Sequence, residues 1–365
     1  MRPAYEYERT SPNVHRIMNE EISDLGSPTM TPTTSGSDTE SDSGANTFGP
    51  DARPTGLPLP PDPGAAALPA GSYDGSVVIV TGGGTGLGKA IAIEFARLGA
   101  SVGILSRKDE HRAAGVAAVE SVIRESRTGG RAWAVPCDIR DPESISVAFD
   151  SVESELGAID VLINNAAGNF PVPAEDMSPN AWRTVVDIVL NGTFYCSREL
   201  ARRLIPNCRD GTIVNVGASY AWTGGPGFAH SAAAKAGVKN MTETLAVEWA
   251  PYGIRVNGLV PGLMPHEDET AAIAAVPGKH VGQDSRVPAG RVGFPRELAW
   301  AATYLCSPFA SYISGHSLVV DGANWQRRHT VMPPFTPIRE QLGRPPFGES
   351  APDTLGTPPA EGASS

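Results

Sequence analysis

The sequence is poor in cysteine, in basic residues and in long apolar runs. Four cysteines in 365 residues form neither a disulfide framework nor a paired Cys-x-x-Cys site, so we expect no metal centre and a reducing, cytoplasmic setting. The 29 Lys and Arg are outnumbered by 40 Asp and Glu, and the resulting net charge of −11 disfavours nucleic-acid binding. No run approaches the roughly 18–20 apolar residues of a membrane span. The N-terminus lacks the apolar core of a signal peptide, and the C-terminal Ala-Ser-Ser is not a peroxisomal signal.

Proline and acidic residues gather toward the ends of the chain. Of the 33 prolines, 11 lie in residues 1–72 and 8 in residues 329–365. The first of these segments also holds ten acidic residues, four arginines and few large apolar residues. Such a composition cannot bury enough apolar surface to offset its chain entropy. We therefore predict one folded domain at 73–328, between a disordered acidic arm at 1–72 and an extended proline-rich tail at 329–365.

Between the two ends, short β-branched runs alternate with amphipathic stretches. This alternation predicts right-handed βαβ crossovers and an α/β fold with a Rossmann-type, doubly wound, parallel seven-stranded sheet. Ligands in such sheets bind at the carboxyl ends of the strands. The predicted strands are 76–80, 101–106, 131–138, 160–168, 211–219, 254–262 and 317–323, with helices at 89–98, 109–126, from 142, from 179 toward 205, and at 231–250.

A glycine-rich loop follows the first predicted strand and opens the first predicted helix. Glycine lets the backbone turn tightly and approach a pyrophosphate, and the helix N-terminus supplies N–H donors and partial positive charge. A plain turn is the alternative, but the strand–glycine–helix context favours dinucleotide binding. The predicted loop residues are Gly82, Gly83, Gly84, Thr85, Gly86, Leu87 and Gly88.

The end of the second predicted strand indicates which dinucleotide is bound. An acidic residue there would bind the ribose 2′-hydroxyl of NAD and repel a 2′-phosphate. The chain instead has Arg107, whose planar guanidinium can pair with a phosphate. We therefore predict NADP(H), although a merely solvated Arg107 would leave the preference open. Asp138, at the end of the third strand, is expected to accept a hydrogen bond from the adenine amino group or to cap a helix.

The motifs together resemble the short-chain dehydrogenase/reductase family over roughly residues 73–328. The resemblance lies in TGGGTGLG at 81–88, NNAAG at 164–168, NVGAS at 215–219 ahead of a lysine, and PG at 261–262. It implies a homotetramer, and it implies that Lys235, Asn165, Pro261, Gly262 and Leu263 lie at the cofactor.

One departure from the family pattern is informative. The usual carbonyl reductases carry tyrosine four residues before the catalytic lysine, but here Ser231 stands one helical turn before Lys235. The serine hydroxyl is too weakly acidic to replace a phenol. The sequence AAGNF, with Tyr220 upstream of the serine, resembles the 2,4-dienoyl-CoA reductase branch. That branch implies Tyr220 and Asn169 as catalytic residues, supported by Lys235 and Ser231.

The resemblance implies an NADPH-dependent reduction of an acyl-CoA substrate in unsaturated fatty-acid breakdown. Hydride would add to a conjugated dienoyl thioester, and the dienolate oxygen would be stabilised by two hydrogen-bond donors. A solvent proton at the α-carbon would then give a 3-enoyl-CoA product. Substrate contacts are implied for Arg140, Phe170 and Ser178, and Asn191 matches a structural or proton-relay position of the wider family.

Several alternatives stay open. Tyr220 could be a core residue and Asn169 a loop cap, while Arg140 and Ser178 could be a surface charge and a helix cap; His230 is interpreted as a core histidine rather than an acid. Residues 263–290, where this family builds its substrate lid, do not match the dienoyl reductases closely. A trans-2-enoyl-CoA reductase, another short-chain carbonyl or alcohol oxidoreductase, and an inactive cofactor-binding scaffold are therefore the other hypotheses.

Overall fold

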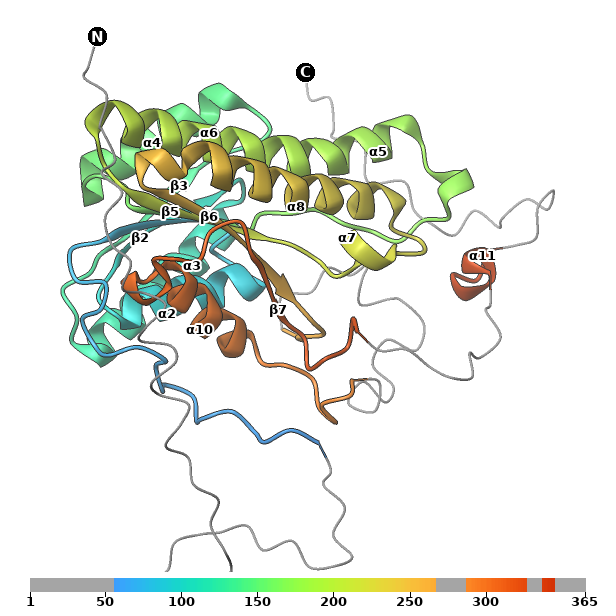
Figure 1. The fold of residues 1–365 in the computed structure, drawn as a ribbon, viewed down its shortest axis with the longest axis horizontal. Coiled ribbons are helices and arrows are strands. Elements are labelled where there is room, and N and C mark those ends of the chain that lie inside the picture. Colours follow the sequence, from blue (N-terminus) through green and yellow to red (C-terminus); the bar gives the residue numbers. More distant parts are fainter. Residues whose placement is uncertain (1–55, 267–286, 327–336, 345–365) are drawn as a thin grey trace, which may run out of the picture. The chain divides into compact units, whose positions relative to one another are not determined.

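The computed structural model describes residues 56–266, 287–326 and 337–344. The core is one sheet of seven parallel strands in the order β3-β2-β1-β4-β5-β6-β7 (Figure 1). This arrangement confirms the predicted fold class. The strands are β1 (Val77–Thr81), β2 (Ser101–Ser106), β3 (Ala132–Pro136), β4 (Val161–Asn164), β5 (Gly211–Val216), β6 (Ile254–Pro261) and β7 (Ser317–Val320).

Helices cover both faces of the sheet (Figure 1). Side chains alternate between the two faces along each strand, so each face carries apolar side chains that a layer of helices buries. In β1, Val78 and Val80 pack toward the face covered by α2, α3 and α10, whereas Val77 and Ile79 pack toward the face covered by α4, α6 and α8. A strand buried on both sides needs a continuous apolar run, as this one has. The longer helices are α2 (Gly86–Arg97), α3 (Asp109–Ser126), α4 (Pro142–Leu156), α5 (Pro179–Val186), α6 (Gly192–Leu204), α8 (Ala229–Trp249) and α10 (Pro295–Cys306).

Two predicted helix starts are confirmed in detail. The Asp141 side chain accepts a hydrogen bond from the backbone N–H of Glu143 at 3.0 Å, and Pro142 is the first residue of α4. Ser178 accepts from the N–H of Ala181 at 3.1 Å at the start of α5. A short polar side chain followed by proline thus marks both helix starts.

The predicted helix from 179 toward 205 is not one regular α-helix. A π-helical turn, η2 (Asp187–Asn191), lies between α5 and α6, and Asn191 Nδ2 donates to Asp187 Oδ1 at 2.8 Å within it. Single π-helical turns are often found at functional sites. A π-helical turn holds one more residue than an α-helical turn, and nothing in the apolar pattern of the sequence indicates this insertion.

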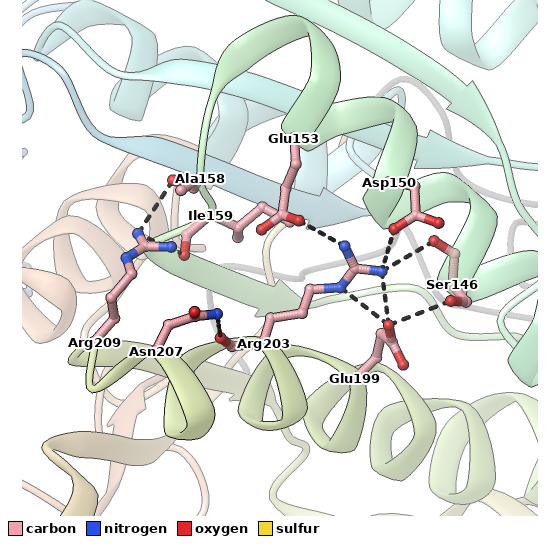
Figure 2. Close-up of polar contacts among 9 residues, drawn as sticks. All are labelled: Ser146, Asp150, Glu153, Ala158, Ile159, Glu199, Arg203, Asn207 and Arg209. Carbon is pink, nitrogen blue, oxygen red and sulfur yellow. Dashed lines mark hydrogen bonds and ion pairs between the residues drawn. The ribbon is translucent and has the colours of Figure 1, made fainter.

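A guanidinium cluster joins α4 to the last turn of α6 (Figure 2). Arg203 binds Glu153 at 2.6 Å, Asp150 at 2.7 Å and Glu199 at 2.7 Å, and it lies over the ring of Phe149 at 5.6 Å. Three carboxylates therefore surround one cation whose side chain is 16% exposed. This cluster fixes how the two helices pack against each other.

A second ion pair lies at the amino-terminal edge of the sheet. Arg209, just before β5, binds Asp160 Oδ1 at 2.6 Å. It also donates to the carbonyl oxygen of Ile159 at 3.2 Å (Figure 2). The other carboxylate oxygen of Asp160 accepts from the N–H of Val77 at 2.9 Å, where β1 begins. The pair therefore ties together the starts of three strands.

Part of the segment that composition assigned to the N-terminal arm contacts the domain. The N–H of Leu57 donates to the carbonyl oxygen of Ala289 at 2.8 Å, and Trp300 Nε1 donates to the carbonyl oxygen of Ala65 at 3.0 Å. Leu57 and Ala65 thus contact the folded domain. The division at residues 73 and 328 stays a prediction, since residues 1–55, 327–336 and 345–365 lie outside the described ranges.

Within the described ranges, no helix is long and apolar enough to cross a membrane. The same residues hold no group of three or more His, Cys, Asp or Glu side chains placed to bind a metal. The homotetramer and the cytoplasmic setting stay predictions.

Candidate active site

The predicted site residues gather where the strands end at the carboxyl edge of the sheet. The phosphate loop follows β1, Asn165 follows β4, and Tyr220 follows β5 after a short turn. At the end of β6, Pro261 pairs with Val320 of β7, and the N–H of the following Gly262 donates to the Val320 carbonyl oxygen at 2.9 Å. Four neighbouring strand ends therefore bring these motifs together, as the parallel sheet predicts.

Tyr220 begins the short helix α7 (Tyr220–Thr223) and lies in a hydrogen-bonded group of three side chains. Its hydroxyl is 3.0 Å from Ser231 Oγ, and Asn169 Nδ2 donates to it at 3.4 Å. Its ring stacks on Phe228, with the ring planes 5° apart and the centroids separated by 6.4 Å. Burial raises the pKa of the Tyr220 phenol, although the Ser231 hydroxyl partly offsets the shift. The phenol therefore stays protonated at neutral pH and is a hydrogen-bond donor.

Lys235 lies one turn after Ser231 on α8 and is buried. Its Nζ donates to the carbonyl oxygen of Val216, the last residue of β5. Burial lowers the pKa of Lys235 to about 8, because the charged form loses its hydration. No carboxylate of the described residues pairs with it. The site thus holds a buried cation that lacks an acidic partner.

His230 packs behind this group. Its Nδ1 accepts from the N–H of Ser231 at 2.7 Å, and its ring meets the ring of Phe170 edge to face, with centroids 4.9 Å apart. Burial lowers the pKa of His230, so the imidazole is neutral at pH 7. The residue holds Phe170 and the start of α8 rather than supplying a proton. This agrees with its interpretation as a core histidine.

The glycine-rich loop has the backbone shape that a dinucleotide needs. Gly82 and Gly86 have positive φ angles of 66° and 51°, which favour glycine. A Cβ placed on Gly88 would lie 2.4 Å from the carbonyl oxygen of Gly82, so the loop and the start of α2 approach too closely for any side chain. Asn165 braces the loop, with Nδ2 donating to the carbonyl oxygen of Thr81 at 3.0 Å. The loop therefore fits a pyrophosphate at the N-terminus of α2.

The other loop residues have structural roles as well. A Cβ on Gly84 would lie 2.0 Å from the carbonyl oxygen of His111, so glycine is needed there for the packing of α3. A Cβ on Gly83 would lie 3.0 Å from Val80 Cβ, which is a tight contact, and Leu87 packs against the core. Thr85 precedes α2 without capping it. The glycine requirement at 83 and 84 thus comes partly from packing.

Arg107, Asp138 and Arg140 form one charged group beyond the ends of β2 and β3. Arg140 Nε donates to Asp138 Oδ1 at 2.9 Å, and Arg107 lies 4.0 Å from the same carboxylate. The hydrogen bond from Arg140 lowers the pKa of Asp138, which is therefore ionised at neutral pH. Arg112 supports this loop by donating to the carbonyl oxygen of Ser106 at 2.8 Å, a role that the sequence did not predict.

The three predicted substrate residues are not all brought together. Phe170 adjoins Asn169 and lies beside the Tyr220 group. Ser178 caps α5, and Arg140 binds Asp138. Their contacts with a substrate stay predictions.

His266 lines the phosphate loop, although the sequence places it only within the predicted lid. A Cβ placed on Gly86 would lie 2.8 Å from its Cε1. Its Nδ1 is buried and has no hydrogen-bond partner within the described part of the chain. This imidazole is thus a candidate contact for a cofactor phosphate. Its position four residues after Gly262, which is predicted to lie at the cofactor, could have indicated this from the sequence. Residues 267–286 of the predicted lid lie outside the described residues.

The chain is similar to oxidoreductases of known sequence and structure. A family model described as enoyl-(acyl carrier protein) reductase matches residues 82–323. An uncharacterized oxidoreductase of Caenorhabditis elegans is 44% identical over 73% of this chain and 84% of its own length. A probable 2,4-dienoyl-CoA reductase, (2E)-enoyl-CoA-producing, of Bacillus subtilis is 42% identical over 68% of this chain and 96% of its own length.

A solved structure matches the same part of the chain. The crystal structure of a short-chain dehydrogenase from Bacillus anthracis is 43% identical, covers 71% of this chain and 99% of its own, and superposes with a TM-score of 0.61. The parallel sheet, the phosphate loop, the buried lysine and these likenesses agree with one another. The chain belongs to the short-chain dehydrogenase/reductase family, whose members bind NAD(P).

Proposed function

We propose that the protein is an NADPH-dependent 2,4-dienoyl-CoA reductase of unsaturated fatty-acid breakdown. The observation that carries the proposal is the hydrogen-bonded group in which Tyr220 contacts both Asn169 and Ser231, with Lys235 one turn further along α8. The similarity to a probable 2,4-dienoyl-CoA reductase supports the same substrate class.

Two neutral donors suit the charge that this reaction develops. When hydride reaches the δ-carbon of a dienoyl thioester, the electrons move through the conjugated system to the thioester oxygen. Burial raises the pKa of Tyr220 further above neutral pH, so its phenol is protonated, and the Asn169 amide lies 3.4 Å from its hydroxyl. Both groups can donate to one oxygen between them and stabilise the dienolate, an effect worth about 10²–10³ in rate for each donor.

Lys235 and Ser231 support this pair. Ser231 lies 3.0 Å from the Tyr220 hydroxyl and restricts its direction. Lys235 adds positive potential at the carboxyl end of β5, where no described carboxylate neutralises it. A buried charge acts strongly on nearby developing charge, since little water screens it. Both residues thus favour the dienolate without transferring a proton.

The charged group beyond β2 supports NADPH over NADH. A bound nicotinamide cofactor supplies the hydride. Arg140 neutralises Asp138 through direct hydrogen bonds. Arg107 lies 4.0 Å from that carboxylate, too far for a direct hydrogen bond, and its side chain is 58% exposed. Arg107 therefore stays available to a 2′-phosphate, which would be held at the end of β2.

The position of the final proton decides the product. Protonation of the dienolate at the α-carbon gives a 3-enoyl-CoA, whereas protonation at the γ-carbon gives a 2-enoyl-CoA. Burial raises the pKa of Tyr220 and lowers that of His230, so the phenol is a weak acid and the imidazole is neutral at pH 7. We therefore propose that solvent delivers the proton to the α-carbon, although the Bacillus subtilis relative is named for a (2E)-enoyl product.

A trans-2-enoyl-CoA reductase is the second candidate. The matching family model is described as enoyl-(acyl carrier protein) reductase. Hydride addition to the β-carbon of a 2-enoyl thioester also places charge on the thioester oxygen. The same two donors would serve both reactions. The double-bond pattern of the substrate separates them.

The test is a panel of acyl-CoA thioesters with NADPH and NADH in parallel. We expect oxidation of NADPH, followed at about 340 nm, with 2,4-hexadienoyl-CoA and little turnover of crotonyl-CoA or acetoacetyl-CoA. NMR of the product distinguishes the 3-enoyl from the 2-enoyl isomer. Faster turnover of crotonyl-CoA would favour the second candidate, and binding of NADPH without any turnover would support the inactive scaffold.

A further inference from the structure

A short helix near the C-terminus contacts the loop that carries Asn169. The helix, α11 (Ile338–Gln341), lies in the segment that composition assigned to the tail, and Figure 1 draws it in red beyond α7. Arg339 Nη2 binds Asp176 at 2.6 Å, and Arg339 Nε binds Glu175 at 3.2 Å. Both carboxylates belong to the short 3₁₀-helix η1 (Ala174–Asp176), seven residues or fewer after Asn169.

Ile338 makes an apolar contact at the other end of the same loop. A Cβ placed on Gly227 would lie 3.2 Å from Ile338 Cδ1 and 4.0 Å from Pro171 Cβ, so the three residues adjoin. The N–H of Val172 donates to the carbonyl oxygen of Gly227 at 2.9 Å. The loop from 169 to 176 is therefore held at both ends, by a salt bridge and by packing.

The turn beneath Ile338 also supports the tyrosine. A Cβ placed on Gly225 would lie 3.1 Å from Tyr220 Cβ, and Phe228 stacks on the Tyr220 ring. One short helix thus touches both structures that place the two donors, namely the loop of Asn169 and the turn against Tyr220.

The Arg339 contact differs from an ordinary single ion pair because one guanidinium meets two carboxylates at once. The Arg339 side chain is 17% exposed, and its two partners are 37% and 35% exposed. Exposed single pairs contribute little, whereas a guanidinium fixed by two partners restricts geometry. Donor direction matters at an oxyanion, because a displacement of about 1 Å can cost about 10²-fold in rate.

We propose that Arg339 is a positioning residue for Asn169, with Ile338 packed against the turn at Gly227. This inference rests on the proposed function, since it assigns Arg339 to reduction of a conjugated thioester at the Tyr220 and Asn169 donors. Arg339 acts through the loop and does not touch the substrate. The C-terminal segment is then a component of the active site rather than a solvated extension.

The test compares charge variants of the full-length chain. Arg339→Glu places a third negative charge against Glu175 and Asp176 and should release the loop. Arg344→Glu is the matched control, because it reverses a charge in the same segment and no described carboxylate pairs with it. A triple variant with Glu175→Lys, Asp176→Lys and Arg339→Glu restores opposite charges in reversed order.

Two measurements are made on each variant. Hydrogen–deuterium exchange reports the protection of residues 169–176, and steady-state kinetics with 2,4-hexadienoyl-CoA gives kcat and KM beside the NADPH dissociation constant. We expect Arg339→Glu to increase exchange in the loop and lower kcat about tenfold. The NADPH dissociation constant should change less than twofold, the control should resemble the wild type, and the triple variant should regain most of the lost kcat.

Unchanged exchange in Arg339→Glu would overturn the contact, and faster exchange with unchanged kcat would overturn the positioning role. A fall in kcat accompanied by an equal loss of NADPH affinity would also overturn it, since that pattern indicates general damage. If the wild-type chain reduces none of the thioesters, the proposed function fails on its own. The exchange comparison then still decides whether Arg339 holds the loop.

Discussion

The two arginines at the amino-terminal edge of the sheet are paired with carboxylates, whereas the buried lysine of the catalytic group at the carboxyl edge is not. At the amino-terminal edge and the helix ends beside it, Arg203 meets three carboxylates (Figure 2), and Arg209 meets Asp160. At the carboxyl edge, Lys235 is buried against the carbonyl oxygen of Val216, and no described carboxylate pairs with it. Paired charges fix packing, whereas a buried unpaired charge leaves its field for whatever binds beside it.

This contrast separates residues that stabilise the fold from residues that serve the reaction. A buried cation without a counter-charge costs folding free energy. Such a residue is retained where the function of the protein requires it. Mutations at the carboxyl edge should therefore lower activity without lowering stability. Mutations at the amino edge should do the reverse.

The largest effect is expected for Tyr220→Phe. The substitution removes one donor from the proposed oxyanion site and keeps the ring that stacks on Phe228. We expect kcat with 2,4-hexadienoyl-CoA to fall by about 10²–10³, or about 3–4 kcal/mol of transition-state stabilisation. Steady-state assays with saturating NADPH and increasing concentrations of 2,4-hexadienoyl-CoA measure the loss of kcat.

Tyr304→Phe is the matched control, because Tyr304 lies on α10 and is partly exposed. It should retain wild-type kcat. Unchanged kcat in Tyr220→Phe would contradict the donor role and would support a tyrosine that only packs.

Lys235→Met tests the cost of the unpaired charge. The folded-state pKa of about 8 lies below the ordinary value of 10.5, so the folded state binds fewer protons between these pH values and stability rises with pH there. Below pH 8 the penalty of about 3 kcal/mol is fully present. We expect Lys235→Met to be more stable than the wild type at pH 7 by up to that amount, yet much less active.

The measurement is denaturant unfolding at pH 7 and at pH 9.5, where the stability difference should shrink. Lys239→Met is the control, since Lys239 pairs with Glu243 at 2.5 Å and is more exposed. A Lys235→Met protein that is less stable than the wild type at both pH values would contradict the interpretation.

Arg203→Met addresses the amino edge. The substitution keeps apolar contact with Phe149 and leaves Glu199, which is 14% exposed, without its cation. We expect the free energy of unfolding to fall by about 2 kcal/mol, less than for a fully buried pair because Asp150 is largely solvated. The kcat per folded molecule should not change.

Thermal unfolding and active-site-normalised kinetics measure the two quantities, and Arg202→Met is the neighbouring exposed control. An Arg203→Met protein of wild-type stability, or one with a large loss of kcat, would remove the distinction between the two edges.

Much of the fold follows from local patterns in the sequence. Buried parallel strands require continuous β-branched runs, and the Asp141 and Ser178 caps followed by proline mark helix starts. The phosphate loop is also local, since the positive φ angles at Gly82 and Gly86 need glycine. Each of these features depends on residues close together in the chain.

The parts that could not be predicted depend on contacts between distant residues. Ile338 reaches Gly227 and Arg339 reaches Asp176, yet composition alone assigned their segment to a tail. The pairing of Asn169 with Tyr220 was inferred from a resemblance, because nothing in their own spacing brings them to 3.4 Å. Composition describes average burial, and a single docked turn is too short to change that average.

The smallest expected effect concerns the cofactor at the carboxyl edge. Arg107→Ser removes a cation that lies 4.0 Å from Asp138 and is mostly solvated, so the fold should not change. We expect the KM for NADPH to rise about tenfold, or about 1.4 kcal/mol, through loss of a charge-assisted contact to the 2′-phosphate. The KM for NADH should stay within twofold, because NADH lacks that phosphate.

Arg124→Ser is the control for Arg107→Ser. Among the described carboxylates, Arg124 pairs only with Glu120 along α3, and it lies away from the end of β2. Equal changes for both cofactors would show that Arg107 shapes the loop and does not read the phosphate, and the carboxyl edge would then lack its proposed means of selecting NADPH.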